Sequence, residues 1–107
     1  MEPTVLIATR DGKIVTSDKI IYFLTPCCNA SATGTQYGTA CRGCYHQIDP
    51  DYGMAATVDG ATALDDVTMM VAWLYGASKI TSKIKDDAAN ALEKAASVYR
   101  HPSRAGR

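Results

Sequence analysis

Four cysteines carry the chemistry that this sequence offers. They stand at Cys27-Cys28 and at Cys41-Arg42-Gly43-Cys44, all within 18 positions. The C-x2-C spacing of Cys41 and Cys44 lets two thiolates reach one tetrahedral zinc ion from a tight turn, and Gly43 frees backbone amides to bond the sulfurs. In a reducing compartment such a cluster indicates metal ligands rather than disulfides. We therefore expect bound Zn2+.

The second half of this metal site must come from Cys27, Cys28 or both. Adjacent residues of an extended strand point to opposite faces, so both thiolates reach one ion only if the chain turns there. Pro26 and Asn29 would support such a turn. The alternative uses one of the two cysteines and the imidazole of His46. We favour Cys27, Cys28, Cys41 and Cys44 as the ligands, because His46 follows Cys44 too closely to reach the ion.

The segment Leu24–Ile48 resembles the small four-cysteine zinc-ribbon and zinc-knuckle proteins, as a structural class. A ribbon normally has C-x2-C at both ends, whereas here Leu24 and Thr25 precede the adjacent cysteines at that spacing and Ala30 and Ser31 follow them. The resemblance implies zinc held by thiolates at the ends of short strands, and contacts with nucleic acid or protein. The first half of the site departs from the pattern, which leaves its ligands open.

Composition places the chain among soluble globular proteins. Its 107 residues are 47% hydrophobic and 21% charged, enough for one domain. No apolar run approaches the roughly 20 residues that span a bilayer, and the first residues lack the features of a signal peptide. We expect a cytoplasmic protein with no membrane contact. A C-x2-C thiol redox protein and an iron–sulfur protein stay as alternatives, although the antiparallel pattern before the cysteines does not suit a thioredoxin-like site.

The elements that position the cysteines begin with an antiparallel β-meander. Strands are predicted over Thr4–Thr9, Lys13–Thr16 and Lys19–Leu24, the first two joined by a type I′ turn at Asp11-Gly12. The glycine-rich stretch that follows predicts a finger-like excursion with a hairpin in it and a short strand over Tyr37–Cys41. We expect zinc to replace the core that residues 25–50 lack, so that losing Cys41 or Cys44 unfolds at least this region.

Helices are predicted after residue 61. Leu64, Val67, Val71 and Leu74 form one apolar stripe of a helix that Thr62 caps and Gly76 ends, and a second helix covers about Thr81–Tyr99. The predicted fold is α+β: an N-terminal antiparallel β-meander with a zinc-clamped loop, then a C-terminal two-helix hairpin. Residues 1–101 form a single zinc-stabilised domain, with the zinc-binding loop over 25–48, the helical hairpin over 62–100 and a basic flexible tail over 102–107.

Charge and side-chain pattern favour an interaction role. Lys and Arg balance Asp and Glu at eleven each, but residues 51–79 are net −3 and residues 80–107 net +3. Trp73, Met69 and Met70 lie on the first helix, and Met69 and Trp73, four positions apart, form an apolar face distinct from the Leu64–Leu74 stripe. This second face indicates a protein partner or a homodimer, with core packing as the alternative. Nucleic acid is the alternative partner, bound through Tyr37 and Tyr45 beside the C-x2-C pair or through Arg100, Arg104 and Arg107.

Catalysis finds little support in the sequence. His46 and His101 are the only histidines, and no nucleophile motif or glycine-rich phosphate loop is present. Four thiolates would also close the zinc shell to substrate. The sequence therefore predicts a small regulatory or protein-interaction module with a structural zinc site, without enzymatic activity or a small-molecule substrate. A nucleic-acid-binding, transcription-regulator-like zinc ribbon is the second hypothesis.

Overall fold

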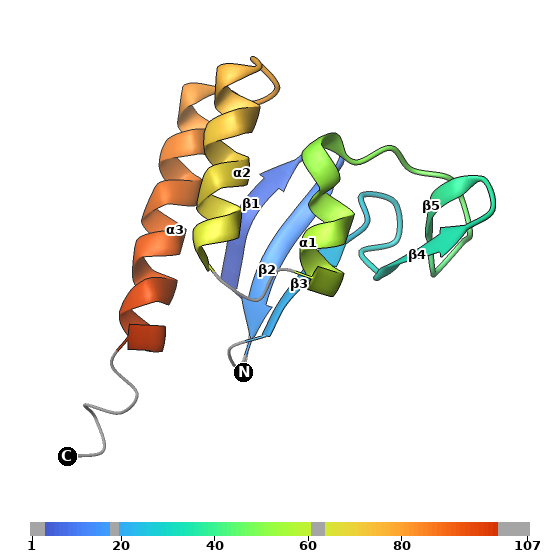
Figure 1. Ribbon diagram of the computed structural model, residues 1–107, viewed down its shortest axis with the longest axis horizontal. Helices are drawn as coiled ribbons and strands as arrows, with labels where there is room; N and C mark the ends of the chain where they lie inside the picture. The colour runs from blue at the N-terminus through green and yellow to red at the C-terminus, as the bar shows by residue number, and fades with distance from the viewer. Residues whose placement is uncertain (1–3, 18–19, 61–63, 101–107) are drawn as a thin grey trace.

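The structure is a computed structural model that describes residues 4–17, 20–60 and 64–100. The elements in chain order are β1 (Thr4–Thr9), β2 (Gly12–Ser17), β3 (Ile20–Leu24), β4 (Ala32–Thr35), β5 (Gly38–Cys41), the 3-10 turn η1 (Asp51–Gly53), α1 (Met54–Gly60), α2 (Leu64–Gly76) and α3 (Ser82–Arg100). The predicted α+β class is confirmed, with strands first and helices after them (Figure 1).

The first three strands form an antiparallel sheet in the order β1-β2-β3, as predicted. Ile7, Ile14 and Phe23 stand in register across it and are buried on one face. The predicted type I′ turn is wrong, because positive φ occurs at Gly12 (φ 134°) and not at Asp11. Gly12 is required for a second reason: a Cβ there would lie 2.4 Å from Cε1 of Phe23.

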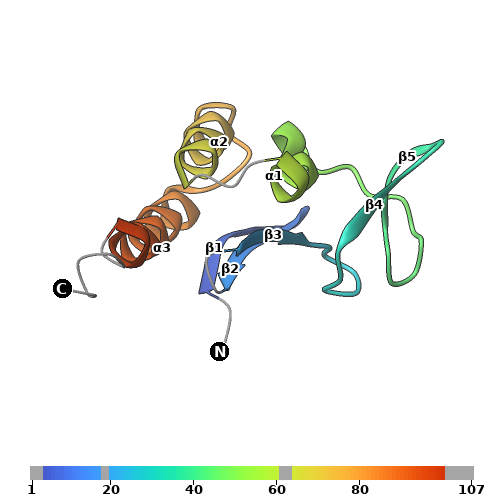
Figure 2. The same ribbon diagram turned by 60° about the horizontal axis from the view of Figure 1, so that its bottom comes forward.

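Three helices cover this sheet rather than the predicted two-helix hairpin. Helix α1 packs against β3 and helix α3 against β1, while α2 packs against α3 (Figure 2). The additional helix, α1, has seven residues, and its buried side chains are Met54 and Thr57. One apolar and one polar anchor are too few to show a helical period in sequence, and so short a helix depends on tertiary packing.

The other helices end close to the predicted residues. In α2 the buried side chains are Val67, Met70, Val71 and Leu74, and the predicted second apolar face keeps Met69 and Trp73 exposed. In α3 the predicted face buries Ala88, Leu92 and Ala95. The predicted cap at Thr62 and the predicted tail over 102–107 lie outside the described residues.

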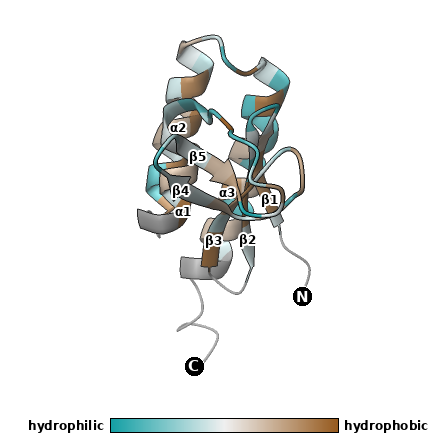
Figure 3. Ribbon diagram, turned by 90° about the vertical axis from the view of Figure 1, so that its right-hand side faces the viewer, coloured by the Kyte–Doolittle hydropathy of each residue, from teal (hydrophilic) through white to brown (hydrophobic). Residues whose placement is uncertain are grey.

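Strands β4 and β5 form a separate two-stranded hairpin at one end of the molecule (Figures 1 and 3). Its register runs from Ala32 opposite Cys41 to Thr35 opposite Gly38. The hairpin contributes little to the main hydrophobic core, which is built from β1, β2, β3 and the helices, with Ala32 only partly buried against it. Something other than apolar burial must hold this hairpin in place.

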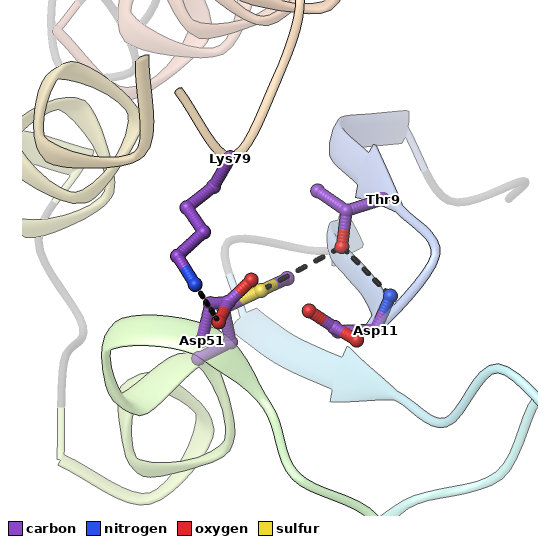
Figure 4. A network of polar contacts seen from close by, with 5 residues as sticks. Thr9, Asp11, Asp51 and Lys79 are labelled. Atoms are coloured by element: carbon purple, nitrogen blue, oxygen red, sulfur yellow. Dashed lines mark hydrogen bonds and ion pairs between the residues drawn. The ribbon is translucent and has the colours of Figure 1, made fainter. Parts of the chain in front are cut away.

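A polar network ties the start of α1 to the rest of the fold (Figure 4). Lys79, after α2, lies 3.6 Å from Asp51 in η1. The Thr9 hydroxyl accepts a hydrogen bond of 3.0 Å from the backbone N–H of Asp11. Burial and the neighbouring Asp51 carboxylate raise the pKa of Asp11. The β1–β2 turn, η1 and the α2–α3 loop therefore meet at one place.

Candidate metal centre

The sulfur atoms of Cys27, Cys28, Cys41 and Cys44 all lie within 4.8 Å of one another. Two short turns bring them together. The first, residues 25–30, follows β3, and the second, residues 41–46, follows β5. No disulfide joins these cysteines. The structure thus brings together the four residues that the sequence suggested as ligands.

The first turn explains how two adjacent cysteines face one site. The N–H of Asn29 donates to the carbonyl of Thr25 at 3.1 Å, and the N–H of Thr25 donates to the carbonyl of Ala30 at 2.7 Å. Asn29 has φ 53°, in the left-handed region that asparagine tolerates better than most residues. The chain therefore reverses at Cys27 and Cys28 instead of continuing as a strand, as the presence of Pro26 and Asn29 suggested.

The second turn repeats the hydrogen bonds of the first, sixteen positions later. The N–H of Tyr45 donates to the carbonyl of Cys41 at 2.7 Å, and the N–H of Cys41 donates to the carbonyl of His46 at 2.9 Å. Tyr45, with φ 59°, takes the left-handed position of Asn29. The two turns are thus equivalent: residue 25 matches residue 41, residue 28 matches residue 44 and residue 27 matches residue 43.

This equivalence accounts for the departure from C-x2-C at Cys27-Cys28. Thr25 occupies the position that Cys41 has in the second turn, and its side chain is directed at the site, with Oγ1 3.2 Å from Sγ of Cys41. The thiol missing from that position is supplied by Cys27, from the position that Gly43 has in the second turn. Sequence reasoning noted that Thr25 stands three residues before Cys28 but did not assign it a role, because only the repeated hydrogen bonds identify it.

Gly43 allows the two turns to approach closely. A Cβ at residue 43 would lie 3.0 Å from Cβ and 3.3 Å from Sγ of Cys28. The N–H of Gly43 also donates to Sγ of Cys41 at 3.2 Å, as its place inside the C-x2-C pair predicted. A side chain here would push the turns apart and separate the sulfurs.

The spacing of the sulfurs suits a tetrahedral thiolate site. Zinc–sulfur bonds of about 2.3 Å in a tetrahedron place two sulfurs about 3.8 Å apart. Sγ of Cys27 and Sγ of Cys44 are 3.7 Å apart. The Thr25 hydroxyl and the Gly43 amide also contact Sγ of Cys41, where they would orient this ligand towards the ion. The residues therefore fit one ion bound by four thiolates.

The thiols of Cys27, Cys28 and Cys41 differ strongly in acidity. Hydrogen bonding from Thr25, with help from the backbone amides of Cys44 and Gly43, lowers the pKa of Cys41 to about 6. Hydrogen bonding with Cys44 and Cys41 raises the pKa of Cys28 to about 12. The pKa of Cys27 is also raised, first by desolvation and then by the same two neighbours. Cys41 thus becomes a thiolate before Cys27 and Cys28 do, and a cation must displace protons from those two.

Solvent exposure also distinguishes Cys41 from the other three cysteines. Cys41 is fully buried, while Cys27, Cys28 and Cys44 are exposed. His46 is exposed and lies outside the group of four sulfurs; it contributes its backbone carbonyl to Cys41 instead. The arrangement with His46 as a ligand is therefore less well supported than the four-thiolate arrangement.

Fold and site together define an α+β protein with a candidate four-cysteine metal centre between two equivalent turns. Comparisons with protein-family models, with curated proteins and with solved structures give no match. Among the described residues, none of the helices is long and apolar enough to cross a membrane. The function must therefore be argued from the geometry.

Proposed function

We propose that this chain is a non-enzymatic protein-interaction module with a structural zinc ion bound by Cys27, Cys28, Cys41 and Cys44. The observation that carries the proposal is the convergence of four sulfurs within 4.8 Å from two equivalent turns. Thiolate ligands in tetrahedral arrangement favour zinc over the harder divalent cations. Four protein ligands also fill the zinc shell, so that no position remains for a substrate.

A structural role follows from the little apolar burial around the site. Between residues 25 and 48 the buried side chains are Thr25, Ala40 and Cys41. The β4–β5 hairpin cannot be stabilised by so small a core, and metal binding would supply the missing free energy. Zinc would thus fix the position of the hairpin relative to β3.

A thiol redox function has less support from the same residues. A reactive thiol combines a low pKa with access to its oxidant or substrate. Here the low pKa belongs to Cys41, which is buried, while the exposed Cys27 and Cys28 have raised pKa values. The low pKa and the solvent exposure that a reactive thiol needs are therefore not combined in Cys27, Cys28 or Cys41.

The interaction role rests on large apolar side chains that the fold leaves exposed. Tyr37 and Tyr45 on the hairpin are 76% and 69% exposed, and Met69 on α2 is 64% exposed. Side chains of this kind, gathered on surface elements of a small protein, are typical of protein contact sites.

Native mass spectrometry of the reduced, untagged full-length chain tests the zinc site. We expect one zinc ion per chain, retained in His46→Ala and lost in Cys44→Ser, and the same spectrum gives the oligomeric state. A metal-free wild-type chain, a chain lighter by two hydrogen atoms through oxidation to a disulfide, or loss of zinc in His46→Ala would contradict the proposed ligands.

A further inference from the structure

A surface hollow of about 360 Å3 lies between the start of α1 and helix α2. Tyr52, Met69 and Asp66 contribute side chains to it. The ring of Tyr52 stacks on Trp73, with ring centroids 4.5 Å apart and planes 13° from parallel. The hollow therefore has an aromatic wall, a thioether and one carboxylate.

A second hollow, of about 560 Å3, lies on the other side of the start of α1, towards the metal-site hairpin. Tyr37 and Asp49 contribute to it. Gly53 and Ala56 line both hollows, so the two meet across the first turn of α1. We call this combined depression the α1 trough. It extends from α2 to the hairpin beside the four cysteines, so a single ligand that fills both hollows would have to cross the first turn of α1 as an extended segment.

The trough carries charge of one sign. Asp49 and Asp66 are the charged side chains among its described lining residues. The neighbouring Asp51 is 3.6 Å from Lys79 and is thereby neutralised (Figure 4), whereas the described ion pairs do not include Asp49 or Asp66. The two carboxylates lie in different hollows, and each offers a partner for a cationic group.

The conformation of Tyr52 argues that its ring has a function at this surface. Its backbone lies in the left-handed region, with φ 48° and ψ 37°, which aromatic residues rarely adopt. Tyr52 and Trp73 nevertheless remain 48% and 44% exposed, while the core face of α2 is complete without them. The chain thus holds a strained residue whose aromatic side chain lines the same hollow as Asp66.

We propose that the α1 trough is a docking site for an extended, arginine-containing segment of a partner protein. A guanidinium group stacks on an aromatic face and pairs with a carboxylate through two parallel hydrogen bonds, and Tyr52 and Asp66 in one hollow offer these two groups. The apolar floor near Ala56 and Met69 accepts the side chains between the basic residues. Nucleic acid fits poorly, because carboxylates repel phosphate. This site rests on the proposed interaction role and gives it a partner chemistry.

A displayed library of random twelve-residue peptides, selected on the zinc-loaded full-length chain, tests the docking site. Parallel selections use Asp66→Asn, Asp49→Asn and, as a matched control, Asp65→Asn, the exposed neighbour that does not line the trough. We expect arginine-enriched peptides with the wild type and with Asp65→Asn, and loss of that enrichment with Asp66→Asn and Asp49→Asn.

The tryptophan fluorescence of Trp73, the single tryptophan, then measures the affinity of the best peptide. Replacing its arginines by citrulline, which keeps the shape and removes the charge, should weaken binding at least threefold. Tyr52→Asn should weaken it by at least the same factor, since asparagine accepts the left-handed backbone but removes the ring. Circular dichroism and zinc content establish that each variant is folded.

Three results would overturn the docking site. Enriched peptides that lack basic residues, or that bind Asp66→Asn and Asp65→Asn equally, would place the contact elsewhere while leaving the interaction role intact. A homodimer that Tyr52→Asn dissociates, or a single-stranded oligonucleotide that competes with the peptide, would assign the trough to a different occupant. Absence of any enriched peptide would contradict both the docking site and the proposed interaction role.

Discussion

Moving the fourth thiolate from residue 27 to residue 25 should preserve the metal site. The two equivalent turns place Thr25 where the second turn has Cys41, with Oγ1 already 3.2 Å from Sγ of Cys41. A cysteine at residue 25 replaces that oxygen by a sulfur, and a small rotation of its side chain would set the spacing of about 3.8 Å that tetrahedral zinc requires. The double variant Thr25→Cys, Cys27→Ser would thus have C-x2-C in both turns.

The expected magnitudes follow from the share of one ligand in zinc binding. Structural zinc sites bind with about 10–16 kcal/mol, so that one thiolate of four accounts for roughly 3–4 kcal/mol. Cys27→Ser alone should therefore weaken the zinc affinity by about 10²–10³-fold, since about 1.4 kcal/mol is a factor of ten. The double variant should recover to within about tenfold of the wild type, because it restores the fourth sulfur but loses the Thr25 hydroxyl.

Competition with a chromophoric chelator gives the zinc affinity of each variant. Ser31→Cys with Cys27→Ser is the matched control, because it also creates a C-x2-C pair, with Cys28, but at a residue outside the repeated hydrogen bonds. In the single variant Thr25→Cys, Cys27 should become free, and mass spectrometry after alkylation of the zinc-loaded protein should find it modified. Equal rescue by both double variants, or rescue by neither, would refute the equivalence of the turns.

Three further predictions concern the same region. After chelation of zinc, hydrogen exchange should be rapid at the amides of residues 27–48, while the amides of β1, β2 and β3 stay protected, because the main core does not include the hairpin. Unfolding of the whole chain on chelation would contradict this prediction. Thr25→Val removes the hydroxyl that lowers the pKa of Cys41, so protons compete better for that sulfur and zinc should leave at a higher pH. The lost hydrogen bond to a charged sulfur is worth about 1.5–3 kcal/mol. Because about four protons bind the thiolates as zinc leaves, this free energy raises the pH at which half of the zinc is released by about 0.3–0.5 unit. Thr25→Ser keeps the hydroxyl and should leave that midpoint unchanged. Gly43→Ala should weaken zinc binding by about tenfold, because its Cβ would meet Cβ of Cys28 at 3.0 Å. Gly34→Ala is the control: its Cβ has no neighbour within 4 Å, so this variant should bind zinc as the wild type does. Equal zinc affinities of the two variants would show that the turns can separate without loss of the site.

Local sequence determined much of this protein. Short runs rich in Val, Ile and Thr and the following Pro26 placed the three strands and their end, because β-branched side chains and the missing amide of proline act over a few residues. The stripe from Leu64 to Leu74 placed α2 for the same reason. The C-x2-C spacing identified Cys41 and Cys44 as a ligand pair, since a single turn decides whether two such thiolates can meet.

Tertiary structure decided what depends on distant segments. Helix α1 exists because Met54 finds a place in a core built from other elements, and seven residues alone are too few to specify a helix. Met69 and Trp73 form an apolar pair at helical spacing but stay 64% and 44% exposed, because the core lies against the Val67–Leu74 side of α2, and a helical period alone does not decide which of two apolar faces is covered. Thr25 and Cys27 obtain their places at the metal site from the repetition of one turn sixteen residues later. That equivalence is a relation between two segments in space, and it becomes visible only once the hairpin brings them together.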